Sequence, residues 1–125
     1  MAYEVLEGLS KLHDNSIIHR DIKPANVFFN NGAAQIGDLN VAKHLKDPFT
    51  VTQTGTPYYA SPEVWSEEPY NYKSDIWSLG CILYEMAVLK PPFRADTPEK
   101  LYKKIMVGKY DPLPSVYSKD LNKFI

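Results

Sequence analysis

"IIHRDIKPANVFF", residues 17–29, is the stretch that decides how this sequence is interpreted. Its centre places histidine, arginine, aspartate, lysine and asparagine within eight residues, and an apolar segment lies on either side. A loop that is pinned by strands at both ends can hold polar side chains in fixed positions, as catalysis requires. We therefore expect a functional loop over residues 19–26, between short strands at 16–18 and 27–29.

The loop carries side chains that a hard metal ion and a phosphate group would need. Asp21 contributes a carboxylate, Asn26 an amide oxygen and Lys23 a positive charge, and Asp38 follows a strand candidate further along the chain. Mg²⁺ with a polyphosphate suits this set, because Mg²⁺ combines few protein oxygens with phosphate and water. No His/Cys cluster has the ligand spacing of a zinc site. From these residues alone, ordinary solvated turn side chains are an equally good explanation.

The rest of the chain has the pattern of a mainly helical α+β fold. Helical spacing of Val5, Leu9 and Leu12 predicts an amphipathic helix over 2–13. The other expected elements are a hairpin of 27–29 and 33–36 that turns at Asn31-Gly32, an irregular segment over 38–63, helices over 74–90 and 98–107, and a loop over 109–118.

The helix expected over 74–90 is apolar around nearly its whole circumference, which predicts burial on all sides. Asp75 lies in its first turn, where a buried carboxylate needs hydrogen-bond donors. Because this helix has 17 residues and carries charges, it is expected in a protein core rather than in a membrane. The helix over 98–107 has Thr97 as its N-cap and Gly108 as its C-cap.

Composition and charge narrow the class of protein. The chain has 125 residues, which suits one domain or part of one. Its net charge is −1, so nucleic acid is not expected as a partner. No apolar run approaches the roughly 20 residues that span a bilayer, so no membrane insertion is expected. Cys81 is the single cysteine and is expected to be a buried apolar residue, which fits a reducing, cytoplasmic compartment.

Four motifs in register resemble those of protein kinases. Residues 19–26, HRDIKPAN, are similar to the kinase catalytic loop H-R-D-x-x-x-x-N. The other three are Asp38-Leu39-Asn40 in place of D-F-G, Ser61-Pro62-Glu63 in place of A-P-E, and Asp75-x-Trp77-Ser78-x-Gly80, which matches the helix that supports the loop. The segment "GTPYYASPE" looks most like the NIMA-related serine/threonine kinases. The resemblance covers essentially the whole chain and implies a partial kinase domain over 1–125.

The resemblance implies a role for each loop residue. Asp21 would accept and orient the Ser or Thr hydroxyl group of a protein substrate, and Lys23 would neutralise the transferring γ-phosphoryl group of ATP. Asn26 and Asp38 would hold the Mg²⁺ ions that bridge the ATP phosphates, Asp38 from a metal-binding turn over 38–40. The position of Lys23 resembles that of a serine/threonine kinase rather than a tyrosine kinase.

Other residues would support this site. By the same resemblance, His19 packs beneath the metal-binding turn, and Asp75 accepts N–H groups from the catalytic loop. Glu63 would pair with an arginine that is missing from this sequence. Leu39 would keep an apolar side chain stacked on His19, and Asn40 would tolerate the φ > 0 backbone that glycine usually adopts.

The activation segment over 38–63 contains the regulatory sites that the resemblance implies. Thr52 stands where NIMA-related kinases usually carry the activating phosphate, added by an upstream kinase or by autophosphorylation. Arg20 would contact that phosphothreonine and so order the segment. Thr56 would bond the catalytic aspartate and lysine and shape the substrate platform. The alternative is that these threonines only reflect the usual composition of a loop and have no regulatory role.

Some kinase motifs are absent from the sequence. It contains no G-x-G-x-x-G and nothing similar to the V-A-I-K lysine strand. We therefore expect a large lobe truncated at both ends and inactive alone. One hypothesis is that this chain is part of a serine/threonine kinase. The family resemblance then implies a cytoplasmic location, with cytoskeletal, ciliary or nuclear association. The other is a non-catalytic module that docks substrates or a full kinase through residues 94–110.

Overall fold

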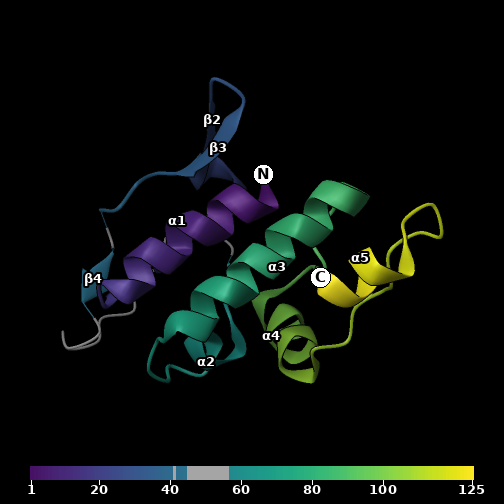
Figure 1. Cartoon of the computed structure of the whole chain (residues 1–125). Coiled ribbons are helices and arrows are strands. Elements are labelled where there is room, and N and C mark those ends of the chain that lie inside the picture. Colours follow the sequence, from purple (N-terminus) through teal and green to yellow (C-terminus); the bar gives the residue numbers. More distant parts are fainter. Residues whose placement is uncertain (41, 45–56) are drawn as a thin grey trace.

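Figure 1 shows the computed structural model, which describes residues 1–40, 42–44 and 57–125. The helices are α1 (Ala2–Asp14), α2 (Pro62–Trp65), α3 (Tyr72–Val88), α4 (Pro98–Val107) and α5 (Lys119–Phe124). The strands are β1 (Ile17–Ile18), β2 (Val27–Asn30), β3 (Ala33–Ile36) and β4 (Lys43–His44), and a 3₁₀ turn, Pro24–Asn26, precedes β2. The described part of the chain is therefore mainly helical with two small antiparallel strand pairs, as the sequence predicts.

The β2–β3 hairpin has the turn predicted from Asn31-Gly32. Asn31 (φ 51°) and Gly32 (φ 82°) both adopt the left-handed backbone conformation. A two-residue turn with φ > 0 at both positions matches the twist of the strands that it joins. The strands pair along their whole length, and Val27 lies opposite Ile36 at the open end. The hairpin therefore places the end of the catalytic loop beside the residues that follow β3.

The first hydrophobic core lies where α1, the hairpin and α3 meet. Figure 1 shows α1 between the hairpin and α3, and α1 contacts both β3 and α3. Val5 and Leu9 point into this core because their spacing puts them on one face of the helix. Ile22, from the catalytic loop, is also buried in it. The buried side chains are Val5, Leu9, Ile22, Ala34, Leu79 and Ile82.

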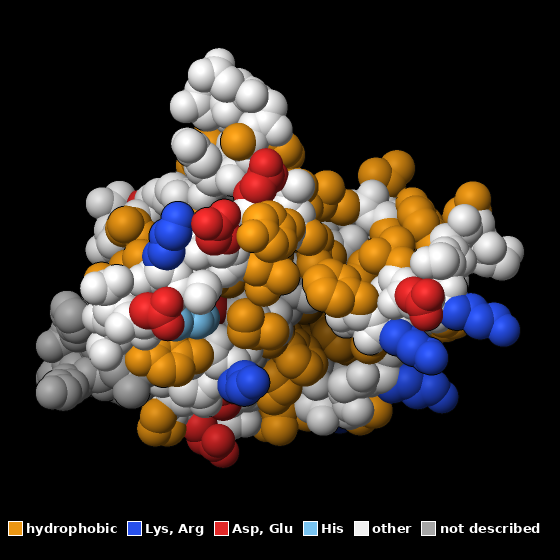
Figure 2. Space-filling view, in the orientation of Figure 1, with side chains coloured by type: hydrophobic (Ala, Val, Ile, Leu, Met, Phe, Trp, Pro, Cys, Tyr) orange, Lys and Arg blue, Asp and Glu red, His pale blue; other side chains and the backbone are white. Residues whose placement is uncertain are grey.

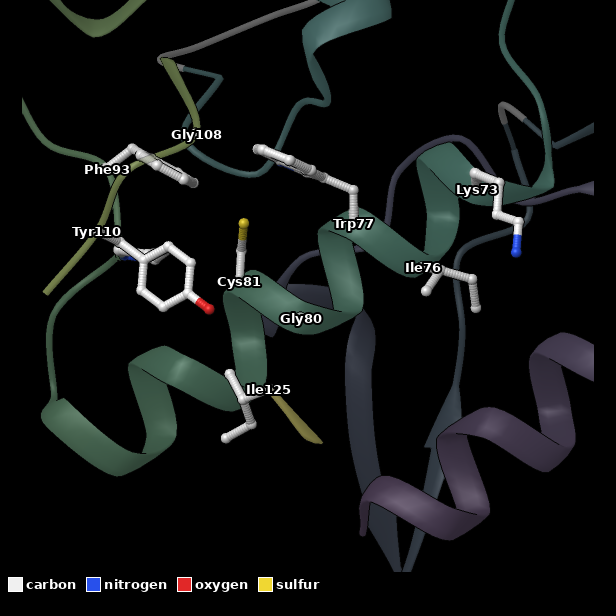
Figure 3. Close-up of a pocket in the computed structure, with 10 residues that line it drawn as sticks. Lys73, Ile76, Trp77, Gly80, Cys81, Phe93, Gly108, Tyr110 and Ile125 are labelled. Carbon is white, nitrogen blue, oxygen red and sulfur yellow. The ribbon is translucent and has the colours of Figure 1, made fainter. Parts of the chain in front are cut away.

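The second core joins α3 to the C-terminal part of the chain. Its buried side chains are Cys81, Phe93, Leu101 and Ile105. Trp77 packs against it, and its ring stacks on that of Phe93 with the centroids 5.5 Å apart (Figure 3). Cys81 is buried as predicted, and burial raises the pKa of its thiol to about 12. Because α3 supplies residues to both cores, it is the central helix of the fold.

The exposure of α3 differs from the prediction of a helix over 74–90 that is buried on all sides. The observed helix is two residues shifted toward the N-terminus, and it exposes Ile76 (41%) and Met86 (52%). Figure 2 shows hydrophobic side chains gathered over α3 on the face toward the viewer. The two cores cover only part of the circumference of the helix, so its apolar sequence does not by itself determine its burial.

Local capping interactions explain the observed ends of α3. The Asn71 side chain accepts the backbone N–H of Lys73, and the Asn71 backbone N–H donates to the Ser74 hydroxyl. This reciprocal capping box begins the helix before the apolar residues start. At the other end, Leu89 adopts a left-handed conformation (φ 61°), which ends the helical hydrogen bonding.

α4 and α1 lie close to their predicted ranges, whereas β4 and the start of α2 fall within the segment 38–63 that was predicted to be irregular. The bounds of α4 equal the predicted range 98–107, with Thr97 accepting a backbone N–H at its N-terminus and Gly108 (φ 68°) at its C-terminus. α1 extends one residue beyond the predicted range 2–13. The predicted loop over 109–118 is irregular, and α5 follows it. Among the described helices, none is both long and apolar enough to cross a bilayer.

Leu9 provides a test of the first core, where its side chain is 1% exposed. Leu9→Ala would leave a cavity, so we expect it to lower the free energy of unfolding by about 3 kcal/mol. The measurement is a urea titration of this chain followed by circular dichroism. Tyr3→Ala is the control, because Tyr3 lies on the same helix but is 77% exposed. Equal effects of the two substitutions would contradict this core.

Candidate active site

Asp75 connects the first turn of α3 to the catalytic loop. Its carboxylate accepts the backbone N–H of His19 at 2.9 Å through Oδ2 and that of Arg20 at 3.0 Å through Oδ1. The side chain is 1% exposed, so these bonds compensate for removing a carboxylate from water. The contacts are those expected from the resemblance, and they fix two consecutive residues of the loop.

His13, at the C-terminal end of α1, is a third partner of this carboxylate that the sequence reasoning missed. Its Nε2 lies 2.9 Å from Asp75 Oδ2. The signal that could have found it is its spacing, because His13 continues the buried stripe formed by Val5 and Leu9 at intervals of four residues. A histidine on such a stripe requires a polar partner, and here that partner comes from α3.

His19 is fully buried beneath the end of β3, as the resemblance implies. Its Nδ1 lies 3.3 Å from the backbone N–H of Asp21, and its Nε2 lies 3.0 Å from the Gly37 carbonyl oxygen. Because the Asp21 N–H can only donate, Nδ1 is the acceptor and Nε2 carries the hydrogen that it donates to Gly37. The His19 ring therefore joins the catalytic loop to Gly37, the residue before Asp38.

Asp21, Lys23 and Asn26 contact one another. Lys23 Nζ lies 2.7 Å from Asp21 Oδ2, and the two side chains are 39% and 33% exposed. The Asn26 amide group donates to the Asp21 backbone carbonyl at 2.7 Å and to its carboxylate at 3.0 Å. Asn26 is buried (4% exposed), whereas the Asp21 carboxylate and the Lys23 ammonium group reach solvent.

Asn26 and Asp38 offer oxygen atoms, a type of ligand that suits a hard divalent cation better than a softer metal. The Gly37 backbone N–H donates to the Asn26 carbonyl at 2.9 Å, which extends the hairpin ladder and brings Asp38 to the end of the loop. Because Asn26 uses its amide N–H groups toward Asp21, its amide oxygen is the atom left to bind a cation. Mg²⁺ usually binds only one or two protein oxygen atoms and takes its other ligands from phosphate and water, so two such oxygen donors would be sufficient. The described residues contain no cluster of three or more His, Cys, Asp and Glu suited to a metal.

The turn after Asp38 differs from the prediction in two respects. The left-handed residue is Asp38 (φ 58°), whereas Asn40 is not among the described residues with positive φ. The Asn40 backbone N–H instead lies 3.4 Å from Asp38 Oδ1. Leu39, which we expected to be an apolar side chain stacked on His19, is 51% exposed. The substitution of glycine by asparagine is therefore accommodated without any left-handed requirement at Asn40.

Arg20 has an unusual backbone conformation and contacts the aromatic side chain of Tyr70. It adopts φ 72°, which is strained for a residue with a long side chain. The Tyr70 hydroxyl donates to the Arg20 carbonyl at 3.0 Å, and the guanidinium carbon lies 5.6 Å from the Tyr70 ring centroid. Burial, reinforced by the Asp75 carboxylate, raises the pKa of Tyr70, so its hydroxyl remains a donor at neutral pH.

The activation segment predicted over 38–63 is described only in part. Glu63 accepts a hydrogen bond from the Ser74 hydroxyl at 2.5 Å, so α3 supplies a partner that the sequence reasoning did not foresee. Thr52 and Thr56 lie outside the described residues. The structure therefore places Glu63 against the start of α3.

The Asp21 side chain thus contacts both Lys23 and Asn26, and Asp38 follows the hairpin that begins directly after this loop. The family described as "Protein kinase domain" matches residues 1–125, which is the whole chain. The chain belongs to this family, and the resemblance to protein kinases is confirmed.

Relatives of this chain include kinases of the NIMA-related group. Serine/threonine-protein kinase Nek3 of Mus musculus is 48% identical over 118 residues, covering 92% of this chain and 23% of the relative. Probable serine/threonine-protein kinase nek2 of Dictyostelium discoideum is 46% identical over 127 residues, covering 98% and 30%. G2-specific protein kinase nim-1 of Neurospora crassa is 49% identical over 108 residues, covering 85% and 13%. The chain thus spans less than a third of the length of these relatives.

Asp75→Asn tests the connection between α3 and the loop. It would replace one accepting oxygen by an NH₂ group that faces N–H donors, so we expect a loss of about 2 kcal/mol in the free energy of unfolding. The loss is measured by urea titration of this chain. Asp96→Asn is the matched control, because the Asp96 side chain is 95% exposed. A stability of Asp75→Asn equal to that of the control would show that these bonds contribute nothing.

Proposed function

We propose that residues 1–125 form most of the large lobe of a serine/threonine protein kinase, which transfers the γ-phosphoryl group of ATP to Ser and Thr hydroxyls of proteins. One observation carries the proposal: the Asp21 carboxylate contacts both Lys23 and Asn26, on a loop whose backbone bonds to Asp75. The printed names of the relatives support the serine/threonine class.

In the proposed reaction, Asp21 orients the substrate hydroxyl and accepts its proton. The hydroxyl oxygen forms a bond to the γ-phosphorus while the bond from that phosphorus to the bridging oxygen breaks, and ADP leaves with that electron pair. Lys23 neutralises the negative charge on the γ-phosphoryl oxygens. Since the Lys23 side chain is 39% exposed, it can exchange part of its contact with Asp21 for a phosphate beside the loop.

Asn26 and Asp38 are the residues that would hold Mg²⁺. The bound ion would neutralise phosphate charge and hold the phosphates in position. Asn26 is buried and oriented by its bonds to Asp21, so little side-chain freedom remains to be lost when its amide oxygen binds. The position of Asp38 follows from the hairpin and from the contact between His19 and the Gly37 carbonyl.

We further propose that residues 1–125 by themselves bind ATP weakly. The sequence lacks the Gly-rich loop that covers the phosphates and the strand lysine that pairs with them. The likeness to NIMA-related kinases supports a cytoplasmic location with cytoskeletal, ciliary or nuclear association. It also supports activation by an upstream kinase or by autophosphorylation.

A non-catalytic binding module is the second candidate function. It is favoured by the exposed apolar side chains of α4, namely Tyr102 (37%), Met106 (45%) and Val107 (74%), which lie within the predicted docking segment over 94–110. Such side chains on one helix are typical of protein interaction surfaces. The two candidates differ in whether Asp21 is required.

Asp21→Asn distinguishes them in the native-length protein that carries residues 1–125. The substitution removes the proton acceptor but keeps the shape of the side chain, so the rate of transfer should fall roughly 10²- to 10⁴-fold. The measurement is transfer of ³²P from labelled ATP to casein, with phosphoamino acid analysis to identify phosphoserine and phosphothreonine. Asp111→Asn, at an exposed loop position, is the control and should retain full activity. Wild-type protein without transfer activity, or a fully active Asp21→Asn variant, would overturn the kinase proposal.

Thr52→Ala tests the proposed activation site in the same protein. Loss of a phosphate that pairs with Arg20 removes a charge-assisted contact of about 1.5 kcal/mol, so activity should fall about ten-fold. Phosphopeptide mapping should also show loss of the label from the activation segment. Thr50→Ala is the control within the same segment. Unchanged activity together with an unchanged label would remove Thr52 from this role.

A further inference from the structure

The backbone before Asp21 is held in an unfavourable conformation. Arg20 has φ 72°, a value that costs free energy in a non-glycine residue and persists only where neighbours determine it. This conformation aims the N–H groups of His19 and Arg20 at the same Asp75 carboxylate. The Asp75 carboxylate therefore stabilises the strained Arg20 conformation. A residue that fixes the position of this carboxylate also affects the conformation of the loop.

His13 holds that carboxylate from α1. An ionised carboxylate only accepts hydrogen bonds, so His13 Nε2 must carry the hydrogen in its 2.9 Å contact with Oδ2, the oxygen that also accepts the His19 N–H. The imidazole is fixed in turn by the Tyr72 ring, with the centroids 4.6 Å apart. His13 is 15% exposed and Asp75 only 1%, so both partners of this contact are largely removed from water.

Tyr70 holds the same stretch of loop from the segment before α3. Its hydroxyl donates to the Arg20 carbonyl, while the N–H of the same peptide unit, that of Asp21, donates to His19 Nδ1. Both ends of the peptide unit that leads into Asp21 therefore have side-chain partners. A peptide plane bonded at both ends cannot rotate without losing a bond, so it sets the direction in which Asp21 leaves the backbone.

We propose that His13 and Tyr70 are positioning residues for the reaction, His13 through Asp75 and Tyr70 through the Arg20 carbonyl. Neither residue belongs to the four motifs that identify the family. Together with Asp75 they form a clamp on the His19–Asp21 backbone, and Asp21 remains the group that touches the substrate. The inference rests on the proposed kinase function, because it assigns the clamp to phosphoryl transfer.

The test combines kinetics with hydrogen exchange. In the native-length protein, His13→Ala and Tyr70→Phe should each lower kcat about ten-fold, the effect of one well-placed hydrogen bond, while KM for ATP changes less than about two-fold. His13→Gln should recover most of the activity, because the Gln amide can donate from a position close to that of Nε2. In the 125-residue chain, the His19 and Arg20 amide hydrogens should exchange about ten-fold faster in the two weakened variants.

Two control variants separate positioning from general destabilisation. Tyr3→Phe makes the same change as Tyr70→Phe at an α1 side chain that is 77% exposed. Lys11→Gln alters an exposed α1 side chain whose ammonium group, among the described residues, pairs with Glu7 at 3.4 Å. Both controls should keep wild-type kcat and wild-type exchange at His19 and Arg20.

The outcomes distinguish this proposal from the proposed function. If the wild-type protein transfers no phosphate, the kinase function fails, and unchanged exchange in the variants would reject the clamp separately. If the wild type is active, unchanged kcat in Tyr70→Phe and His13→Ala overturns the positioning role. Failure of His13→Gln to recover activity overturns the part assigned to His13. Should His13→Ala fail to fold, Tyr70→Phe and His13→Gln still decide the question.

Discussion

A carboxylate that is only 1% exposed must receive hydrogen bonds, or its burial would destabilise the protein by several kcal/mol. Asp75 meets this requirement with donors from two other elements, His13 at the end of α1 and the backbone of His19 and Arg20 in the catalytic loop. Its place in the first turn of α3 adds the favourable field of a helix N-terminus. Because the buried Asp75 carboxylate needs all of these donors, it fixes α1, α3 and the loop relative to one another.

A second connection, through His19, joins this arrangement to the candidate metal ligands. Asp75 fixes the His19 backbone, and the His19 ring bonds the Asp21 N–H on one side and the Gly37 carbonyl on the other. The hairpin then brings the residue after Gly37 to the end of the loop. Because each of these bonds uses backbone groups, the arrangement depends on few side-chain identities beyond Asp75 and His19.

The sequence predicted the elements whose signals are local. Asn31-Gly32 determined the hairpin turn, and Thr97 with Gly108 determined both ends of α4, because turn and cap preferences act within a few residues. The four motifs likewise identified the family. A left-handed backbone was predicted at Asn40, but the structure has it at Asp38. The backbone at Asp38 depends on the surrounding contacts, which the local sequence does not specify.

Contacts between distant residues were not predictable in the same way. His13 and Asp75 are separated by 62 positions, and Tyr70 and Arg20 by 50, so no local pattern pairs them. The exposure of Ile76 and Met86 had the same cause, since burial depends on which elements pack around α3. The resemblance already implied that Asp75 accepts N–H groups from the loop, but only the fold identified His13 as its third partner.

The site divides into a buried half that fixes positions and an exposed half that can react. His19, Asn26 and Asp75 are each at most 4% exposed and hydrogen-bond within the protein, and of these three only Asn26 keeps a side-chain oxygen for a cation. Asp21 and Lys23 are 33% and 39% exposed, so their charged groups remain accessible to a substrate and a phosphate. This division suits phosphoryl transfer, in which positioning and charge neutralisation supply most of the rate enhancement. The free energy of holding the strained Arg20 conformation is thus already supplied on the buried side, which is the preorganisation that the proposed phosphoryl transfer requires.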